Sequence, residues 1–168
     1  MAKVLFVIAP KDFRDEELFH TKEELEKAGH TSTIASLRKG ACSGRMGGSA
    51  EATLAVDEAK ASDFDAVVFV GGGGAAVYFE NHAAFNLAKN FKNQEKIVSA
   101  ICIAPSILAN AGVLKGKKAT CFPSEKDNLR VKGANYTGTP VEVDGRIITA
   151  NGPEAARAFG KKIAEALK

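Results

Sequence analysis

Short apolar runs alternate with amphipathic segments along all 168 residues, and this alternation constrains the fold more than any other feature. Runs such as Val4–Ala9 and Ala66–Val70 are as long as strands and are apolar throughout. Continuous apolar strands are typical of a parallel sheet that is buried on both faces. The alternation therefore predicts an α/β fold, with three αβα layers around a doubly wound, mostly parallel sheet.

The same pattern predicts where the elements begin and end, because glycine and proline mark many of the boundaries. We expect strands at 3–9, 31–36, 66–70, 96–101, 118–122, 141–143 and 146–149, and helices at 15–28, 82–93, 104–111, 124–132 and 153–167. Residues 41–56 are small and glycine-rich, and short strands are expected there. The dipeptide Asp144-Gly145 predicts a two-residue hairpin turn. Without repeats or linkers, residues 1–168 are expected to form a single domain.

Charge and composition exclude several classes of function. The net charge is only +3, aromatic residues make up 7% and there is no Trp, so no nucleic-acid partner is expected. The densest basic cluster, Lys115, Lys117 and Lys118, is interpreted as a solvated loop. No stretch approaches the ~20 apolar residues of a membrane span, and Val4–Ala9 is shorter than the apolar region of a signal peptide. A cytoplasmic protein without membrane association is expected.

The three cysteines are Cys42, Cys102 and Cys121. Their wide separation argues for reduced thiols rather than a disulfide framework. No CxxC or HxxxH pair is present, so neither zinc nor another metal is expected. We interpret Cys42, in a small-residue stretch, and Cys121, in an expected strand, as structural.

Cys102 lies where the strand 96–101 gives way to a helix. A side chain on such a sharp turn is exposed at the edge of the sheet, as in a nucleophile elbow, here with Cys in place of Ser. The start of the following helix would favour the thiolate. The alternative interpretation is a buried cysteine that packs as a small hydrophobic residue.

Two other segments leave strands at the same edge, where ligands bind in doubly wound sheets. The run Gly71–Gly74 fits a backbone pocket for an anion or oxyanion, with a plain turn as the alternative; its match to a dinucleotide fingerprint is loose. Asp15, Glu16 and Glu17 open the first helix, where acidic residues ordinarily complement the helix dipole. A carboxyl that points toward Cys102 would instead be protonated, donate to the sulfur and shuttle a proton.

Several motifs occur together along the chain. They are Lys3-Val4-Leu5-Phe6, Asp15-Glu16-Glu17-Leu18, Asp63 to Val68, Gly71–Gly74, Ala100-Ile101-Cys102 with Ala104-Pro105, Ala111 to Lys118, Lys126-Asp127-Asn128 and Gly152-Pro153. In this combination the chain resembles the ThiJ/PfpI superfamily over nearly its whole length. The resemblance implies a flavodoxin-like, class I glutamine amidotransferase-like fold, a homodimer or larger homo-oligomer, and chemistry without a cofactor.

Carried over to this sequence, the resemblance makes Cys102 the reactive cysteine and Glu17 the glutamate that hydrogen-bonds the thiol. It makes the N–H groups of Gly73 and Ile103 the oxyanion pocket. Members described as proteases have His directly after the cysteine, where this chain has Ile103. They also have a Glu shortly after the double glycine, where this chain has Ala75-Ala76-Val77.

Without this His and Glu, a Cys–His relay cannot form, so an intracellular peptidase is the least favoured function. The leading hypothesis is a glyoxalase III-type or deglycase-like enzyme for small α-oxoaldehydes, in which Cys102 is the nucleophile and Glu17 the proton shuttle. Arg45, Phe122 and Asn151 are weaker candidates for substrate contacts. The alternative is a redox-sensing or protective protein that is oxidised at Cys102.

Overall fold

A computed structural model describes residues 1–168, and its centre is a seven-stranded sheet in the order β11-β12-β8-β7-β1-β3-β6. All neighbouring strands are parallel except β11 and β12, which form an antiparallel hairpin. The strands are β1 Lys3–Val7, β3 Thr31–Ser36, β6 Leu54–Ala55, β7 Ala66–Phe69, β8 Ile97–Ile101, β11 Val141–Asp144 and β12 Ile147–Ala150. The four central strands β1, β7, β8 and β12 are almost entirely buried, as their apolar sequences predict.

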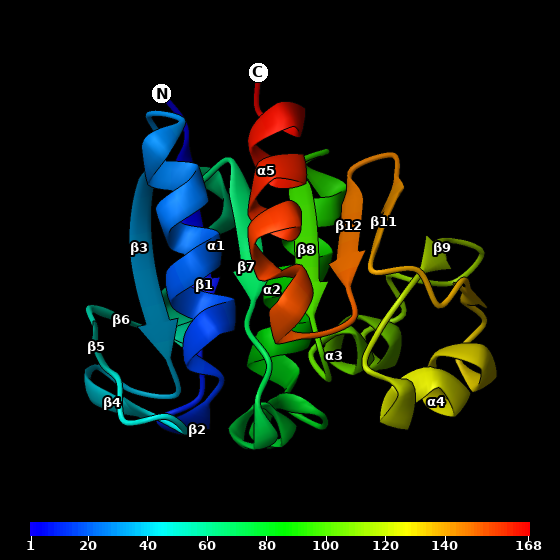
Figure 1. Cartoon of the computed structure of the whole chain (residues 1–168), viewed down its shortest axis with the longest axis horizontal. Coiled ribbons are helices and arrows are strands. Elements are labelled where there is room, and N and C mark those ends of the chain that lie inside the picture. Colours follow the sequence, from blue (N-terminus) through cyan, green and yellow to red (C-terminus); the bar gives the residue numbers. More distant parts are fainter.

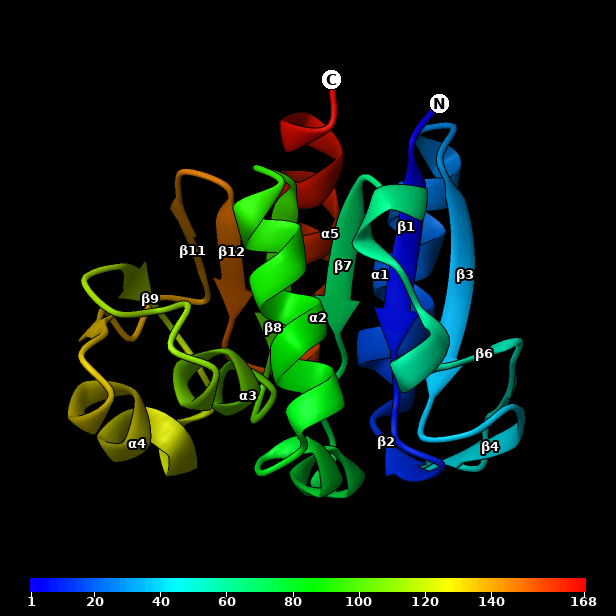
Figure 2. The same ribbon diagram turned by 180° about the vertical axis from the view of Figure 1, so that it is seen from behind.

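Helices cover both faces of this sheet. Figure 1 shows α1 (Asp15–Lys27) and α5 (Ala156–Ala166) packed side by side on one face. Figure 2 shows α2 (His82–Asn93) and α3 (Pro105–Asn110) on the other face, with α4 (Lys126–Val131) beside α3. Short 3-10 turns complete the connections at η1 Val56–Glu58, η2 Ala61–Asp63, η3 Gly73–Tyr78, η4 Pro123–Glu125 and η5 Pro153–Ala155. The predicted three-layer α/β fold is confirmed.

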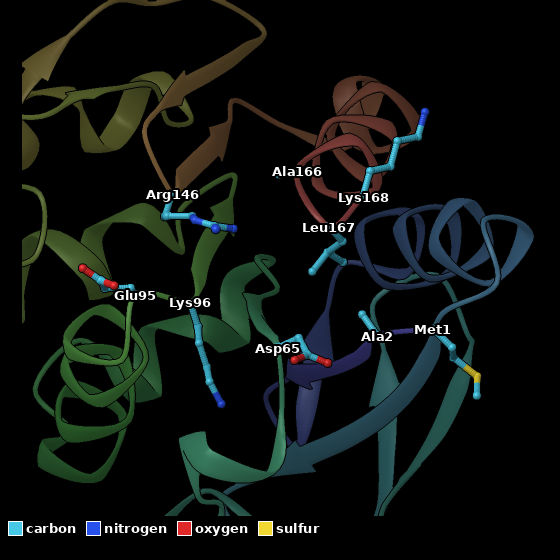
Figure 3. A pocket seen from close by; sticks show the side chains of 9 residues that line it. All are labelled: Met1, Ala2, Asp65, Glu95, Lys96, Arg146, Ala166, Leu167 and Lys168. Carbon is cyan, nitrogen blue, oxygen red and sulfur yellow. The ribbon is translucent and has the colours of Figure 1, made fainter.

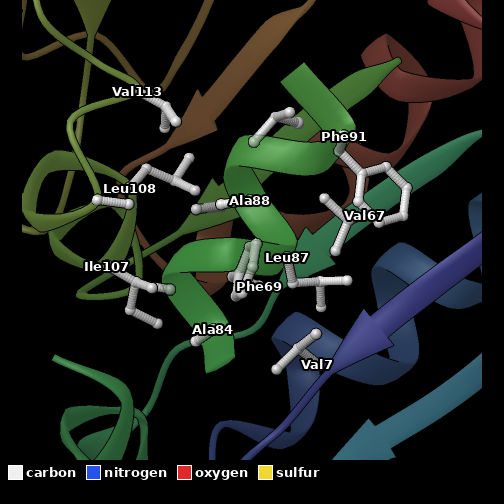
Figure 4. Packing of buried hydrophobic residues seen from close by; sticks show 14 of the residues in the cluster. Val7, Val67, Phe69, Ala84, Leu87, Ala88, Phe91, Ile107, Leu108 and Val113 are labelled. Carbon is white, nitrogen blue, oxygen red and sulfur yellow. The ribbon is translucent and has the colours of Figure 1, made fainter. Parts of the chain in front are cut away.

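The sheet divides the interior into two hydrophobic cores. One core lies under α2 and α3, where Phe69, Leu87 and Phe91 pack together (Figure 4). The other lies under α1 and α5 and contains Phe6 and Phe159. Each fully buried side chain of this size contributes about 1.5–3 kcal/mol from the removal of apolar surface from water. These two cores hold the strand ends in fixed relative positions.

Two small sheets extend the main one. The first joins β2 (Lys11–Phe13), β4 (Gly40–Gly44) and β5 (Ser49–Ala52), and the second pairs β9 (Lys118–Ala119) with β10 (Asn135–Tyr136). The expected strand 118–122 is thus only two residues long. It stops because the Phe122 N–H donates to Cys102 O at 2.8 Å, and Pro123 then begins a 3-10 turn.

The hairpin differs from its prediction by one residue. Asp144 pairs with Ile147, so Gly145 and Arg146 form the turn in place of Asp144 and Gly145. The Asp144 carboxylate accepts a hydrogen bond from the Lys118 N–H at 2.8 Å and therefore belongs to the strand. Gly145 carries the positive φ of 62° that the turn requires.

The carboxyl ends of the parallel strands lie at the edge opposite the two chain ends, which is the lower edge in Figure 1. The segments that follow β1, β7, β8 and β12 meet there. None of the helices combines the length and the apolarity that a membrane crossing requires.

Candidate active site

Cys102 is the first residue after β8, and its backbone has a positive φ of 66°. A residue with a side chain rarely adopts this conformation, which costs on the order of 1–3 kcal/mol. Two hydrogen bonds from neighbouring segments hold it in place. The Cys102 N–H donates to Ala150 O at 2.9 Å, and Cys102 O accepts from the Phe122 N–H. The predicted strand-to-helix turn is therefore present, but the prediction of an exposed side chain is wrong: Cys102 is only 8% exposed, because it packs in the core under α1 and α5.

Glu17 lies in the first turn of α1 and is completely buried. Neither of its carboxyl oxygens has a hydrogen-bond partner of full geometry. An ionised carboxylate without partners is costly in such a place, so burial raises the pKa of Glu17 to about 7. The Cys102 thiol and the Gly71 N–H lie beside the carboxyl and oppose this shift in part. Glu17 is therefore poised to exchange a proton near neutral pH.

Gly71 makes the approach of these two side chains possible. A Cβ atom at Gly71 would lie 2.5 Å from Glu17 Oε1 and 2.6 Å from Cys102 Cβ. Real Cβ atoms essentially never come this close to other heavy atoms, so any side chain here would push the carboxyl and the cysteine apart. The need for glycine at this position is thus set by the site itself.

The thiol is not the ready thiolate that the helix start alone would favour. Burial, with the nearby Glu17 as the second cause, raises the pKa of Cys102 to about 12. The backbone N–H groups of Gly72 and Ile103 oppose this shift. Glu17 loses its proton at a lower pH, so after that first loss one proton remains for the two groups. The thiolate then forms when this proton moves from sulfur to the carboxyl.

Of the two predicted oxyanion groups, Ile103 lies beside the sulfur, whereas the role of Gly73 stays a prediction. The Ile103 N–H faces Cys102, and on the glycine side the Gly72 N–H acts on it. Gly73 is the next residue, and its Cα faces the Asp12 carboxylate. Backbone N–H groups placed in this way are suited to stabilise negative charge on a bound oxygen.

The three weaker candidates for substrate contacts, Arg45, Phe122 and Asn151, come from three different segments of the chain. Arg45, in the turn after β4, places Nη1 3.7 Å from Oδ1 of Asp12, the β2 residue that faces Gly73. Phe122 is 44% exposed and is tied to Cys102 through its N–H. Asn151 follows β12, and its N–H donates to Pro140 O at 3.0 Å. The structure shows no side-chain hydrogen bond for Asn151, so its contact with a substrate stays a prediction.

Sequence reasoning missed Arg14 and undervalued Asp15. The Arg14 N–H donates to Gly71 O at 3.0 Å and fixes the glycine loop to the start of α1. The Asp15 carboxylate accepts from the N–H groups of Met46 and Gly48, at 2.8 and 2.7 Å, and fixes the β4–β5 turn to the same helix. The sequence did contain one indication of these roles, because an Arg followed by three acidic residues stands at the start of one helix.

A cavity of about 400 Å³ lies beside the site, between the starts of α1 and α5. Its lining contains no hydrophobic side chain and consists of Arg14, Glu16, His20, Pro153, Glu154 and Arg157. It adjoins the segments that hold the elbow, because Arg14 binds the glycine loop and Pro153 follows β12 closely.

A second cavity, of about 410 Å³, lies at the opposite edge of the sheet between the two chain ends (Figure 3). Two of its polar side chains have structural partners. Lys96 Nζ donates to the carbonyls of Ala61 and Phe64, and Asp65 accepts from the Lys3 N–H. No cysteine lines this cavity, whereas Cys102 lies at the carboxyl edge of the sheet. No group of three or more His, Cys, Asp or Glu side chains is arranged to hold a metal ion.

Comparison with known proteins identifies the family of the chain. The chain is 44% identical over 170 residues to the uncharacterised protein MJ0967 of Methanocaldococcus jannaschii, an alignment that spans 99% of this chain and 83% of the relative. It is 34% identical to deglycase PH1704 of Pyrococcus horikoshii, with 99% of both chains covered. The structure of a ThiJ/PfpI domain protein from Brachyspira murdochii superimposes with a TM-score of 0.96 at 35% identity, covering 98% of this chain and 95% of the other. Residues 2–166 match the DJ-1/PfpI family as a whole, and the chain belongs to that family.

Proposed function

We propose that this protein is a cofactor-independent cysteine enzyme that acts on small α-oxoaldehydes such as methylglyoxal. In this proposal Cys102 is the nucleophile and Glu17 moves the protons. The N–H groups of Gly73 and Ile103, with that of Gly72, stabilise the developing negative charge on oxygen. A deglycase-like hydrolysis of the adducts that oxoaldehydes form with amines would begin at the same thiol, and a relative carries the name deglycase.

The reaction begins when the thiol proton passes to Glu17 and the sulfur adds to the aldehyde carbon. The aldehyde oxygen takes up the proton, which gives a hemithioacetal. Glu17, again a carboxylate, then removes the C–H proton of that carbon and returns it to the neighbouring carbon, while the hydroxyl proton passes to the neighbouring oxygen. The first carbon is oxidised and the second is reduced, so no external oxidant is needed. Water finally cleaves the thioester to a 2-hydroxy acid and the free thiol.

One observation carries the proposal: a fully buried carboxyl that has no ion pair and no hydrogen bond of full geometry lies beside the thiol of a strained cysteine. A carboxyl with a pKa of about 7 is both an acid and a base at neutral pH, which this proton transfer requires. A structural carboxylate would instead have been paired or exposed to water.

The direct test is the formation of lactate from methylglyoxal. We expect turnover by the unmodified protein and its loss in both Cys102→Ser and Glu17→Gln, with Cys121→Ser as the matched control that retains activity. Absence of turnover by the unmodified protein would contradict the proposal and would implicate Ile103, whose side chain stands next to the nucleophile in the chain.

Peptidase activity receives no support from the site. Ile103 follows the cysteine where a relay histidine would be needed, and Ala75, Ala76 and Val77 occupy the stretch of the accompanying glutamate. Without that imidazole, the Cys–His relay of a cysteine peptidase cannot form.

The same unpartnered carboxyl supports a second candidate, a redox-sensing or protective protein. A protonated Glu17 would donate to a sulfinate formed on Cys102 and stabilise it. Intact-mass measurement after mild peroxide treatment distinguishes the two functions. A gain of two oxygens confined to Cys102 favours the sensor, whereas oxidation spread over all three cysteines and both methionines contradicts it.

We also propose that the chain forms a homodimer or a larger homo-oligomer, as its family resemblance implies. Exposed apolar side chains near the carboxyl edge, such as Phe19 at 36% and Met46 at 64%, are compatible with such an interface. Sedimentation velocity of the purified chain tests this assembly, and a monomer at micromolar concentration would contradict it.

A further inference from the structure

Arg14 is a charged residue whose backbone binds the glycine loop and the turn of Glu17, whose side chain lines the polar cavity beside the site, and for which the proposed chemistry has no use. It precedes α1 and is the N-terminal cap residue of that helix. Its backbone N–H holds Gly71 O, and its backbone O accepts from the Glu17 N–H at 3.1 Å. The residue thus contacts both the glycine loop and the helical turn that carries Glu17.

The side chain of Arg14 has a fixed position. Its Nε and Nη2 atoms lie 3.0 Å from Glu16 Oε1 and Oε2, so the guanidinium is held by two parallel hydrogen bonds. These bonds raise the pKa of Arg14 and lower that of Glu16, so the pair stays ionised. Because the Arg14 side chain is only 29% exposed, water screens its charge less than that of a surface arginine.

We propose that Arg14, held by Glu16, is a positioning residue that stabilises negative charge on the Cys102–Glu17 pair and thereby sets the reactivity of the thiol. The guanidinium favours the ionised forms of both groups, whereas the Glu16 carboxylate opposes part of that effect. Compared with the unmodified protein, the thiol would therefore react faster when Arg14 is present without the Glu16 charge. It would react more slowly when neither charge is present. The proposal concerns the thiol itself and does not depend on which substrate the enzyme uses.

Three of the other charged groups near the site have partners that direct them elsewhere, and two line the cavity without contacting Arg14. Arg157 shares the cavity with Arg14, but its Nη1 lies 2.7 Å from Glu24 Oε2, further along α1. Arg45 reaches Asp12, the β2 residue that faces Gly73. The Asp15 carboxylate is bound to backbone N–H groups of the β4–β5 turn. His20 and Glu154 line the cavity without a hydrogen bond or ion pair to Arg14.

The test is the rate at which iodoacetamide alkylates Cys102 between about pH 6 and pH 10, in a background of Cys42→Ser and Cys121→Ser. We expect Arg14→Gln to raise the apparent pKa of the thiol and to slow alkylation at pH 7 by about fivefold or more. Glu16→Gln is expected to accelerate alkylation by about two- to fivefold, because Arg14 then acts without its counter-charge. Arg14→Lys is expected to restore more than half of the rate lost in Arg14→Gln.

Arg157→Gln is the matched control, since it removes a guanidinium from the same cavity but from a different acidic pair. Its alkylation profile should coincide with that of the parent protein. Circular dichroism of each variant confirms that the fold is intact. The proposal is overturned if Arg14→Gln alkylates at the parent rate, or if Glu16→Gln slows the reaction as Arg14→Gln does, since the pair would then act only as a structural clamp.

Discussion

Cys102 and Cys121 lie in two neighbouring segments of the chain, because the N–H of Phe122, next to Cys121, donates to Cys102 O. Burial raises the pKa of both thiols to about 12. Cys121 has an ordinary backbone and packs in the core under α2 and α3. Cys102 has a positive φ, a neighbouring carboxyl without partners and two backbone N–H groups that face it.

The comparison teaches that a shifted thiol pKa does not identify a nucleophile. Both cysteines have the shift, and for the same first cause. Both cysteines pack in a hydrophobic core, Cys121 under α2 and α3 and Cys102 under α1 and α5, so burial does not separate them. Each thiol has a carboxyl group near it, but Glu125, near Cys121, accepts hydrogen bonds from the hydroxyls of Ser106 and Ser124. Cys102 differs because Glu17 has no such partner and because its backbone conformation is strained. Because Cys102 has both features, we propose it as the reactive thiol.

The largest difference is expected in turnover. Replacing Cys102 by Ser should lower the rate of lactate formation by at least about 10³-fold, because an alcohol beside a carboxyl is a far weaker nucleophile than a thiol. Replacing Cys121 by Ser should change the rate by less than about threefold. Steady-state kinetics of both variants measures this contrast, and equal losses in the two would remove the distinction between the cysteines.

The next largest effect is expected in the pH dependence of the free energy of unfolding, because Glu17 is buried. The pKa of Glu17 rises from 4.5 to about 7 on folding, so the folded chain keeps a proton that the unfolded chain loses. Stability therefore falls as the pH rises from about 4.5 to 7, by on the order of 3 kcal/mol from this residue, and stays lower above pH 7.

Glu17→Gln should remove this loss of stability, since an amide does not titrate. Urea unfolding at about pH 5 and pH 8 measures it. Glu125→Gln, close to Cys121 in the chain, is the control that should keep the slope of the parent protein. If the stability of the unmodified protein did not change over this pH range, folding would not raise the pKa of Glu17, and the prediction would be wrong.

A smaller effect is expected from adding one methyl group between the two reactive side chains. In Gly71→Ala the new Cβ would also lie 2.7 Å from Ile101 O, so the overlap involves backbone that cannot move freely. We expect a loss of about 1–3 kcal/mol in unfolding free energy together with loss of turnover. Gly152→Ala is the control, because its nearest neighbour is Phe122 Cδ1 at 3.8 Å and its φ of 166° suits any residue. Equal tolerance of both substitutions would contradict the close approach of Glu17 and Cys102.

The smallest effect concerns the second kind of positive φ in the chain, which lies at a helix end and outside the site. Glu95 has a positive φ of 58° at the end of α2, where the Lys96 N–H donates to Phe91 O at 2.9 Å. This is a helix end that glycine suits better, so Glu95→Gly should stabilise the protein by about 0.5–1 kcal/mol without changing turnover. Thermal unfolding and kinetics of this variant provide the measurement. A fall in stability would show that the Glu95 side chain contributes more than the strain costs.

Much of the fold could be predicted because it depends on local pattern. Thr31–Ser36 and His82–Asn93 have the expected bounds, since apolar periodicity and flanking Gly or Asn mark their ends. The three-residue strand β2 and the two-residue strand β10 were not predicted, because segments so short carry no periodicity. They exist only through their pairing with β4 and β9.

The site was predictable only in part. The strand-to-helix turn indicated Cys102, and the family resemblance indicated Glu17. The roles of Gly71 and Arg14 could not be predicted, because they depend on distances across the sheet edge that no sequence spacing specifies. The charge triplet at residues 15–17 also divided in the structure: Asp15 binds a turn, Glu16 holds Arg14, and Glu17 faces the thiol.

The account's central claim is that Cys102 and Glu17 act as one unit, and a double-mutant cycle on lactate formation tests it most directly. We predict that Cys102→Ser and Glu17→Gln each reduce turnover to the same residual level, and that the double variant is no slower than either. If Glu17→Gln retained activity within about tenfold of the parent, or if the two losses multiplied, the carboxyl and the thiol would act independently and the account would be wrong.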